Sequence, residues 1–220
     1  RRLEQAKIDF FAYAGHELKS PLTSIIGYQE MIKDGIITDK GEIAKALDRS
    51  LGQAREMRDI IRDMLDISAL ESRKPRDIGP VDLADTARET IVALKPLAMI
   101  DDVRLIADLR PLRVLMNAQD AVRLIRNLVE NAIKYNKSGG MVYLRTDADK
   151  RTLEVVDNGI GMSQEDVKRC FERFYRVKGT HISGSGLGLA IIKHICSYYG
   201  FGVDVASKLG QGSTLSLILL

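Results

Sequence analysis

The stretch NAQDAVRLIRNLVENAIKYN, residues 117–136, decides the class of fold, because it predicts one amphipathic helix in a region otherwise rich in strands. Its apolar side chains fall on one face of that helix. They are Val122, Ile125, Leu128, Val129 and Ile133. A helix with such a face must bury it against another layer of secondary structure, and the neighbouring sequence supplies strands for that layer.

Strand-like segments lie on both sides of this helix. They are VRLIADL (103–109), LRVLM (112–116), MVYLRTD (141–147) and TLEVVDNG (152–159). The last two segments alternate between apolar and polar residues. This alternation predicts paired strands that turn around Asp149 and Lys150.

Two further helices follow these strands. SQEDVKRCFERF, residues 163–174, predicts a helix with Ser163 as its N-cap and Asp166 as the partner in a capping box. GLGLAIIKHICSYYG, residues 186–200, predicts a helix that ends at Gly200.

The chain closes on two strand-like segments, VDVASK (203–208) and STLSLILL (213–220). Helices therefore alternate with strands in this half, and we expect the strands to pair antiparallel. The predicted fold is an α/β sandwich, in which one layer of helices covers one sheet.

The first 72 residues show a different pattern, that of two long helices joined by a turn. In the first helix, a seven-residue repeat is formed by Phe11, Leu18, Ile25 and Ile32, with Leu22 and Ile36 beside it. In the second, from about residue 42 to 72, the repeat is Leu47, Ala54, Ile61 and Ser68, widened by Leu51, Met57, Met64 and Leu65. The turn KDGIITDKGE, residues 33–42, interrupts the pattern with two glycines.

These two helices predict an antiparallel helical hairpin. The apolar stripes are wider than one hairpin can cover, so we expect two chains to pair as a four-helix bundle, which makes the protein a homodimer. SRKPRDIGP, residues 72–80, predicts a linker, because it holds two prolines, a glycine and mixed charge. We therefore expect a hairpin domain over 1–72, a linker over 73–80 and an α/β domain over 81–220.

The composition narrows the possible partners. The 220 residues carry a net charge of +3, no Trp and only 5% aromatic residues, which argues against nucleic-acid binding. No stretch reaches the roughly 18 apolar residues of a membrane span, so we expect no membrane contact by this chain.

Cys170 and Cys196 form no ligand cluster and indicate small buried side chains in a reducing compartment. The chain begins without Met and in a helical pattern. We therefore expect it to be a cytoplasmic piece of a longer protein, whose remaining part is open to carrying a membrane anchor.

GHELKSPLTS, residues 15–24, holds one of the three histidines. His16 lies about half a turn from the apolar seam, so its imidazole faces solvent, with Glu17 beside it and Ser20 one turn on. A solvated surface histidine is one interpretation. The other is a neutral imidazole nucleophile whose proton Glu17 accepts, with Pro21 bending the helix one turn after that glutamate. The segment alone leaves both interpretations open.

NLVENAIKY, residues 127–135, places Asn127 and Asn131 one turn apart, and Lys134 three residues further on. Amide oxygens suit Mg²⁺ when phosphate oxygens and waters complete its ligands, and lysine offers a charge for phosphate. A polar stripe on a surface helix explains these residues equally well.

DNGIGM, residues 157–162, follows a predicted strand. Asp157 at the strand end is placed to accept a hydrogen bond from an adenine amino group, and Gly159 and Gly161 let the backbone approach a ligand. A simple turn is the alternative and, for this segment alone, the better explanation.

GSGLGLA, residues 184–190, opens a helix with Gly184, Gly186 and Gly188, whose N–H groups suit an anionic phosphate. Three alternating glycines alone are weak evidence, and neither a dinucleotide-binding loop nor a P-loop is present. The preceding CFERFYRV, residues 170–177, offers the apolar anchors Phe171 and Phe174 and a phosphate-binding group in Arg176. Between the two, VKGTHIS (177–183) predicts a mobile lid.

Over essentially its whole length the chain resembles the catalytic core of bacterial sensor histidine kinases of two-component systems. The segments that carry the resemblance stand in the family's order. HELKSP (16–21) resembles its H box, NLVENAIKY its N box, DNGIGM its first glycine box, CFERFYRV its F box and GSGLGLA its second glycine box, while GQGST (210–214) resembles a weaker last motif. Each motif alone is modest, but the ordered set behind a helical hairpin is highly specific.

The resemblance implies a dimerisation and phosphoacceptor hairpin followed by an ATP-binding domain of the Bergerat type. It makes His16 the phosphoacceptor and Glu17 its acid–base partner, and it implies Mg²⁺ ligation by Asn131 with support from Asn127. Lys134 and Arg176 would contact phosphates, Tyr135 would lie along the adenine, and Asp157 would accept from its amino group. The implied nucleotide-binding backbone comprises Gly159, Gly161, Gly184, Gly186, Leu187 and Gly188.

The implied activity is ATP-dependent autophosphorylation on His16, followed by transfer of the phosphoryl group to an aspartate of a response-regulator receiver domain. Gly15 stands where the family usually has Ser, and Lys19 where Arg is commoner. Ser20 stands where the family usually has Thr or Asn, a residue that positions water for dephosphorylation of the regulator. Ser20 keeps a hydroxyl without the methyl, so phosphatase activity towards the regulator stays an open expectation.

Three other functions fit the sequence less well. A chaperone or topoisomerase type of ATPase resembles the second half only and leaves the hairpin with His16 unexplained. A degenerate kinase that serves as a dimeric scaffold would not need Asn131, Asp157 and the glycines. A nucleic-acid binder would need a basic patch with interleaved aromatic residues, which the sequence lacks.

Overall fold

The computed structural model describes residues 2–71, 77–177 and 184–219, with side chains in the first range from residue 12 to residue 70. The chain divides into two compact units. The first ends at Ser68 but also includes Gly184 and Ser185, and the second holds the remaining described residues from Ala69 onward. The predicted linker lies partly outside the described residues, and strand β1 already begins at Gly79 within it. The predicted lid, except for its first residue, also lies outside them.

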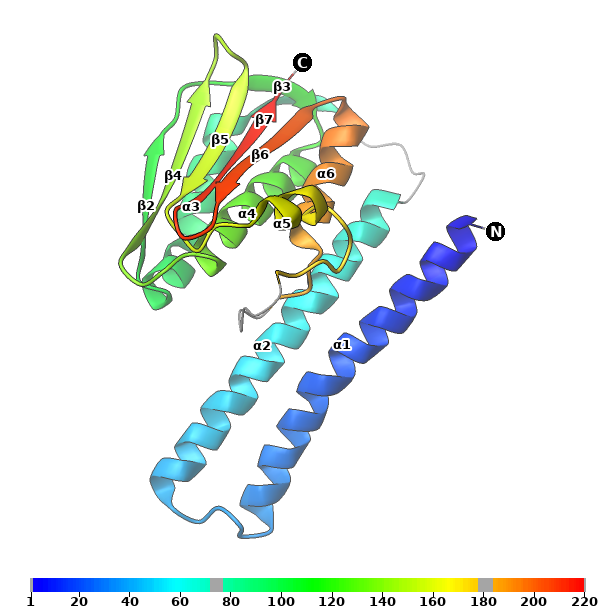
Figure 1. Cartoon of the computed structure of the whole chain (residues 1–220), viewed down its shortest axis with the longest axis vertical. Coiled ribbons are helices and arrows are strands. Elements are labelled where there is room, and N and C mark those ends of the chain that lie inside the picture. Colours follow the sequence, from blue (N-terminus) through cyan, green and yellow to red (C-terminus); the bar gives the residue numbers. More distant parts are fainter. Residues whose placement is uncertain (1, 72–76, 178–183, 220) are drawn as a thin grey trace. The chain divides into compact units, whose positions relative to one another are not determined.

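The first unit is the predicted antiparallel hairpin, made by α1 (Arg2–Lys33) and α2 (Lys40–Glu71) (Figure 1). The turn between them is closed by Asp39, whose Oδ1 accepts hydrogen bonds from the backbone N–H of Gly41 at 2.9 Å and of Glu42 at 3.0 Å. These bonds satisfy N–H groups that the first turn of a helix leaves without partners. Among the described helices, none combines the length and apolar character needed to cross a bilayer.

The side chains buried inside the hairpin differ from the predicted stripe on α2. Ala46, Ser50, Ile60 and Ile67 are buried. The predicted repeat of Leu47, Ala54, Ile61 and Ser68 is exposed, as are Leu22, Ile36, Leu51 and Leu65. The seven-residue stripe of α2 therefore lies beside the buried side chains, and its apolar residues form surface of the kind that one hairpin was expected to leave uncovered.

The second unit is built on a mixed five-stranded sheet in the order β2-β4-β5-β7-β6 (Figure 1). The strands are β2 (Val103–Asp108), β4 (Gly140–Asp147), β5 (Thr152–Asp157), β6 (Gly202–Lys208) and β7 (Gly212–Ile218). The pairs β4–β5, β5–β7 and β6–β7 are antiparallel as expected. The pair β2–β4 is parallel, which corrects the expectation that all the strands pair antiparallel. A separate two-stranded sheet pairs β1 (Gly79–Asp82) with β3 (Arg113–Met116).

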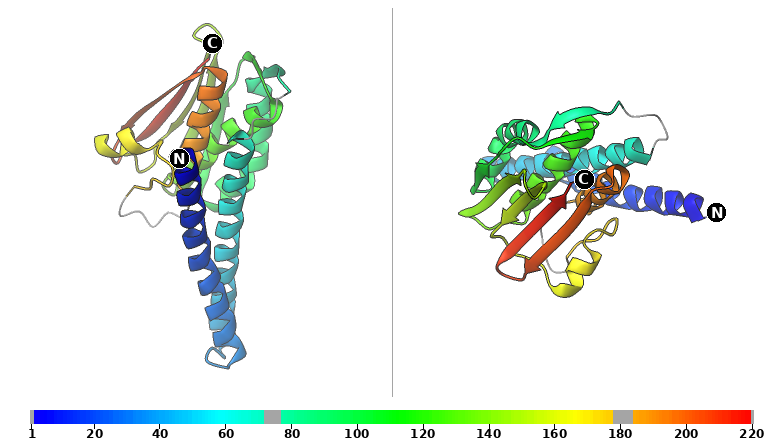
Figure 2. Two further views of the ribbon diagram at one scale, coloured as in Figure 1. Left: turned by 90° about the vertical axis from the view of Figure 1, so that its right-hand side faces the viewer. Right: turned by 90° about the horizontal axis from the view of Figure 1, so that it is seen from above.

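A layer of helices covers one face of the five-stranded sheet, so the α/β sandwich is confirmed (Figure 2). The layer contains α3 (Leu83–Ile100), α4 (Ala118–Lys134) and α6 (Gly188–Tyr199). α4 buries the predicted face at Ile125, Leu128, Val129 and Ile133, whereas Val122 is 44% exposed and does not belong to that face. Alternate residues of β4 and β5 are buried beneath the helices, and the other face of the sheet carries polar and charged side chains.

The short helix α5 (Gln164–Arg169) has the predicted capping box. Ser163 Oγ accepts from the backbone N–H of Asp166 at 3.2 Å, and Asp166 Oδ2 accepts from the backbone N–H of Ser163 at 3.1 Å. The helix ends earlier than predicted, because the chain from Cys170 onward forms turns. α6 ends as predicted at Gly200, which adopts a φ of 73° that glycine takes without steric cost.

Candidate functional site

His16 is exposed on α1, as its distance from the apolar seam predicts. The helix runs through Pro21, which is buried, without interruption. Proline has no N–H and removes a helical hydrogen bond one turn back, at the carbonyl of Glu17. Two hydroxyls bond back onto the same stretch: Thr23 Oγ1 donates to the Lys19 carbonyl at 2.8 Å, and Ser24 Oγ to the Ser20 carbonyl at 3.2 Å.

The two polar neighbours of His16 differ in burial. Glu17 is half-buried, whereas Ser20 is exposed one turn beyond the histidine. Gly15, directly before the histidine, is exposed, and a β-carbon built on it would meet no atom within 4 Å. A side chain at position 15 therefore has room, and the glycine is not required there by packing.

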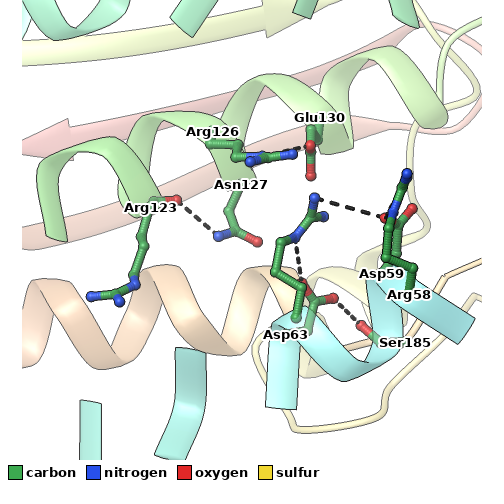
Figure 3. A network of polar contacts seen from close by, with 9 residues as sticks. Arg58, Asp59, Asp63, Arg123, Arg126, Asn127, Glu130 and Ser185 are labelled. Atoms are coloured by element: carbon green, nitrogen blue, oxygen red, sulfur yellow. Dashed lines mark hydrogen bonds and ion pairs between the residues drawn. The ribbon is translucent and has the colours of Figure 1, made fainter. Parts of the chain in front are cut away.

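On α4, Asn127 and Asn131 lie against the first residue of α6. A β-carbon on Gly188 would stand 3.2 Å from Asn127 Oδ1 and 3.0 Å from Asn131 Nδ2, which is tighter than nearly all real contacts. Asn127 is buried, and its Nδ2 donates to the Arg123 carbonyl at 2.8 Å (Figure 3). That bond directs its oxygen towards the start of α6. The two predicted amides and Gly188 therefore come together.

Charged side chains of α4 flank this pair. Glu130 is buried and accepts a hydrogen bond from Arg126 Nε at 2.8 Å (Figure 3). Asp120, also buried, forms an ion pair with Arg123 Nη1 at 3.1 Å. Both carboxylates are thus matched by arginines of the same helix. The side-chain oxygen atoms nearest to Gly188 are those of the Asn127 and Asn131 amides.

Asp157 ends β5 and is 8% exposed. Its Oδ1 accepts from two backbone groups, the N–H of Gly159 at 2.8 Å and the N–H of Ser213 at 3.2 Å. Burial raises the pKa of the carboxyl group above its ordinary value, and the two N–H groups oppose that change. With Oδ1 fixed by the backbone, Oδ2 is oriented to accept a hydrogen bond from a ligand.

Glycines are required around Asp157 because other backbone lies against them. A β-carbon on Gly159 would stand 2.1 Å from the Tyr135 carbonyl oxygen, and one on Gly161 2.0 Å from the Lys208 carbonyl oxygen. Gly212, with a φ of 100°, would place a β-carbon 2.1 Å from the Asp157 carbonyl oxygen. No side chain fits at these contacts, so the loops that frame the aspartate pack directly backbone against backbone.

Lys134, Tyr135 and Arg176 are half-buried. Burial raises the pKa of the Tyr135 hydroxyl, and the positive charge of Arg176 acts against that rise. Burial also raises the pKa of the Asp101 carboxyl group, and the positive charge of Lys134 acts against that rise. The charge of Lys134 therefore acts on a carboxyl group that the sequence analysis did not connect with it.

The other predicted residues of the second glycine loop differ in how closely the rest of the chain packs against them. Gly186 adopts a φ of 68°, and a β-carbon on it would stand 2.7 Å from the carbonyl carbon of Phe174. Gly184 has no atom within 4 Å of such a β-carbon. Leu187 is fully buried in the core, so its side chain fixes the loop to the domain. It precedes α6 without a side-chain cap, which leaves first-turn N–H groups of this helix for another partner.

Two residues beside Asp157, Gly212 and Ser213, were not among the predicted site residues, although the motif that contains them was identified. The signal for them was GQGST, residues 210–214, whose last three residues begin β7 and lie at the end of β5 because the two strands pair. As a whole the site can bind a ligand that has an amino group for Asp157 and an anionic part for the start of α6. Within the described residues, no cluster of three or more His, Cys, Asp or Glu side chains could hold a metal ion. Asn127 and Asn131 offer only amide oxygens, a set that suits Mg²⁺ when phosphate oxygens supply its other ligands.

Two family models match the chain. Residues 6–73 match the "His Kinase A (phospho-acceptor) domain", and residues 116–220 match the "Histidine kinase-, DNA gyrase B-, and HSP90-like ATPase" family. The first match contains His16, and the second contains Asn127, Asp157 and the glycine loops.

Proteins similar along almost the whole chain are sensor proteins. The phosphate regulon sensor protein PhoR of Pseudomonas aeruginosa is 34% identical, over 98% of this chain and 50% of its own length. The sensor protein SrrB of Staphylococcus aureus is 29% identical, over 99% of this chain and 38% of its own length. The chain thus spans half or less of the length of these curated relatives.

Solved structures share the fold. The Acinetobacter baumannii histidine kinase AdeS has a TM-score of 0.71 at 20% identity, with 93% of this chain and 97% of that chain covered. The histidine kinase ThkA, solved in complex with the response regulator protein TrrA, has a TM-score of 0.76 at 19% identity, with 100% and 64% covered.

Proposed function

The chain is the catalytic core of a sensor histidine kinase, and from this premise we propose that it phosphorylates His16 from ATP and then phosphorylates a response regulator. The observation that carries the proposal is the arrangement around Asp157. A buried carboxylate has one oxygen fixed by backbone N–H groups, in the same domain as two amides that lie against the start of α6. That arrangement suits a ligand with an amino group at one end and phosphates at the other.

In the proposed first step, an imidazole nitrogen of His16 attacks the γ-phosphorus of ATP. The new P–N bond forms as the bond from phosphorus to the bridging β–γ oxygen breaks, and ADP leaves with the electron pair. The other ring nitrogen loses its proton to Glu17, so the phosphorylated ring is neutral. Catalysis comes mainly from alignment of the two groups and from neutralisation of phosphate charge.

Mg²⁺, when bound with ATP, would neutralise phosphate charge, and Asn131 and Asn127 are the residues proposed to hold it. Lys134 and Arg176 would add positive charge near the phosphates, Tyr135 would lie along the adenine, and Asp157 would accept from its amino group. The N–H groups at the start of α6, with Gly184, Gly186 and Gly188, would receive phosphate oxygens.

In the second step, a carboxylate oxygen of the regulator's aspartate attacks phosphorus. The P–N bond breaks, and the imidazole takes back a proton. The solved complex of ThkA with TrrA is a precedent for such a partner in that protein. We also propose that Ser20, exposed one turn from His16, orients water for removal of the phosphoryl group from the regulator.

A single labelling experiment tests the proposed activity. The protein is incubated with Mg²⁺ and ATP labelled in its γ-phosphate, and protein-bound label is then exposed to acid or base. A phosphohistidine loses its label in acid and keeps it in base. Failure of the wild-type chain to acquire such a label would reject the proposed activity.

We propose that two chains pair through the apolar side chains exposed on the hairpin. Leu65 is 65% exposed, and Leu47 and Leu51 about half, along one stripe of α2, with Leu22 and Ile26 exposed on α1. An apolar surface this continuous favours association. We expect a dimer in light scattering at micromolar concentration, and a Leu51→Glu, Leu65→Glu double variant is expected to shift it to the monomer. A wild-type monomer under these conditions would contradict the pairing.

The domain limits stay proposals: a hairpin over 1–72, a linker over 73–80 and an ATP-binding domain over 81–220. We place the reaction in the cytoplasm, where ATP and receiver domains are available. The rest of the full-length protein, including any membrane anchor, would supply the sensing function.

Replacing Gly15 by alanine is expected to stabilise the hairpin. The position is exposed inside α1 with open space around it, so alanine removes the entropic cost of glycine, about 1 kcal/mol. We expect the melting temperature followed by circular dichroism at 222 nm to rise by about 2–4 °C. Gly52→Ala, at an equally open and exposed position of α2, is the matched control. If both variants stabilise but only Gly15→Ala lowers labelling of His16, a flexible backbone before the histidine is needed for activity.

A further inference from the structure

The carboxylate of Asp166 has one more partner than a capping box provides. Its Oδ2 accepts from Ser163 Oγ at 2.5 Å and from the Ser163 backbone N–H at 3.1 Å, which closes the start of α5. Its Oδ1 accepts from the Tyr175 hydroxyl at 2.7 Å. That third bond reaches across the end of α5 and ties the chain beyond the helix back to its first turn.

Tyr175 is fixed by its ring and its backbone as well. The Arg169 guanidinium lies over the ring, 4.5 Å from its centroid, and is itself held by Glu172 at 3.1 Å. The Tyr175 backbone N–H donates to the Glu172 carbonyl at 3.3 Å. The hydroxyl, the ring and the backbone N–H of Tyr175 therefore each have a partner in α5 or in the turn that follows it.

Phe174, directly before Tyr175, has a backbone conformation that needs support. Its φ of 64° lies in the left-handed region, which bulky residues rarely adopt and which costs about 1–3 kcal/mol. The Phe174 N–H donates to the Gly186 carbonyl at 2.9 Å, and Gly186 packs so closely there that a β-carbon would stand 2.7 Å from the Phe174 carbonyl carbon. The strained residue thus joins the F-box segment to the glycine loop.

Arg176 follows this supported turn directly and is half-buried, two residues beyond Phe174, whose N–H bonds to the glycine loop. The direction in which Arg176 leaves the backbone is set by Phe174 and Tyr175, because only one residue separates the strained φ from the arginine. Without the hold on Tyr175, we expect Phe174 to relax towards an ordinary conformation and the direction of Arg176 to change.

We propose that Tyr175 is a positioning residue for nucleotide binding: its hydrogen bond to Asp166 maintains the strained turn at Phe174 and thereby keeps Arg176 directed at the phosphates. The proposal rests on the proposed function, in which Arg176 contacts phosphate. Tyr175 itself touches no reacting atom. Its hydroxyl acts through the arginine, so its contribution applies only to ligands that carry phosphates.

Tyr175→Phe in the full 220-residue chain removes only the hydroxyl and tests the proposal. Affinity for the Mg²⁺ complex of a non-hydrolysable ATP analogue is measured by calorimetry, and affinity for adenosine serves as the phosphate-free probe. We expect the analogue to bind about fivefold more weakly, the ratio to which one net hydrogen bond corresponds, and adenosine to bind unchanged. Tyr143→Phe is the matched control, because Tyr143 lies on β4 among residues of the uncovered sheet face.

A second arm places Tyr175→Phe in an Arg176→Ala background. If the tyrosine acts only through the arginine, the double variant binds the analogue no more weakly than Arg176→Ala alone. Equal affinities of wild type and Tyr175→Phe would overturn the proposal, as would a fivefold loss that persists without Arg176 or extends to adenosine. Failure of wild type itself to bind the analogue would instead count against the proposed function, so the two failures are distinguishable.

Discussion

His16→Ala is expected to reduce acid-labile labelling from γ-labelled ATP by at least about a thousandfold, because the variant lacks the nucleophilic atom that receives the phosphoryl group. Nucleotide affinity should stay at the wild-type value, since His16 is not among the residues proposed to hold ATP, and all of these except Gly184 belong to the second unit. Labelling is followed by gel autoradiography, and affinity by calorimetry with the Mg²⁺ complex of a non-hydrolysable analogue. The pair of measurements separates loss of the acceptor from loss of the donor.

The matched control for this variant is His194→Gln. His194 lies on α6, where its Nε2 stands 3.3 Å from the Leu70 carbonyl, and glutamine can maintain a hydrogen bond to that oxygen. We expect this control to be labelled like wild type. Strong residual labelling of His16→Ala would mean that another side chain is the acceptor, and the assignment of His16 would have to be abandoned.

Asp157→Asn is expected to weaken ATP binding by about a hundredfold, which corresponds to roughly 2.7 kcal/mol. Asparagine can keep its oxygen on the N–H groups of Gly159 and Ser213, so the loop geometry survives. Its amino group then replaces the carboxylate oxygen that faces the ligand. A donor thereby meets the amino group of adenine, itself a donor, and the charge-assisted hydrogen bond is lost.

The same substitution is expected to stabilise the unliganded protein at neutral pH. Burial raises the folded-state pKa of Asp157 above its ordinary value of 3.8. A raised pKa means that the carboxyl favours folding below pH 3.8 and that this contribution is lost as the pH rises through the folded-state pKa. At neutral pH the buried charge therefore opposes folding, and an uncharged side chain of the same shape removes that cost.

Thermal unfolding without nucleotide at pH 7.5 measures this effect. We expect a higher melting temperature for Asp157→Asn than for wild type, with a difference that shrinks as the pH falls towards 4. Asp204→Asn, on the exposed edge strand β6, is the control and should change neither affinity nor the pH dependence. Wild-type affinity in Asp157→Asn would show that the carboxylate does not contact the base.

The elements that the sequence predicts well are those with strong local signals. The capping box at Ser163, the end of α6 at Gly200 and the buried face of α4 all depend on residues close together in the chain. α3 escaped prediction because Val92, Met99 and Ile100 are exposed among its buried residues, and Pro96 stands inside the helix. Tertiary packing stabilises that helix against its local signals.

The site divides in the same way. Asp157, the glycines and Asn127 have distinctive local contexts, whereas Ser213 joins Asp157 only because β7 pairs with β5. On α2 the predicted repeat is real, but periodicity alone does not say which of two adjacent apolar faces closes the hairpin. Which face of α2 packs inside the hairpin depends on the side chains of α1, so the local sequence of α2 does not predict it.

The parallel placement of β2 has a consequence for how the second domain assembles. β4–β5 and β6–β7 are joined by short turns, so each can form as a local hairpin soon after collapse. β2 must wait for the chain from residue 109 to 139, including all of α4, before it can pair with β4. Pairing of β2 with β4 costs the entropy of closing this loop, and we expect packing against the helix layer to offset that cost. We therefore expect amide hydrogen exchange during refolding to show protection of the two hairpins first. The β2–β4 pair and the β5–β7 pair, which is closed by the still longer stretch 158–211, should gain protection later.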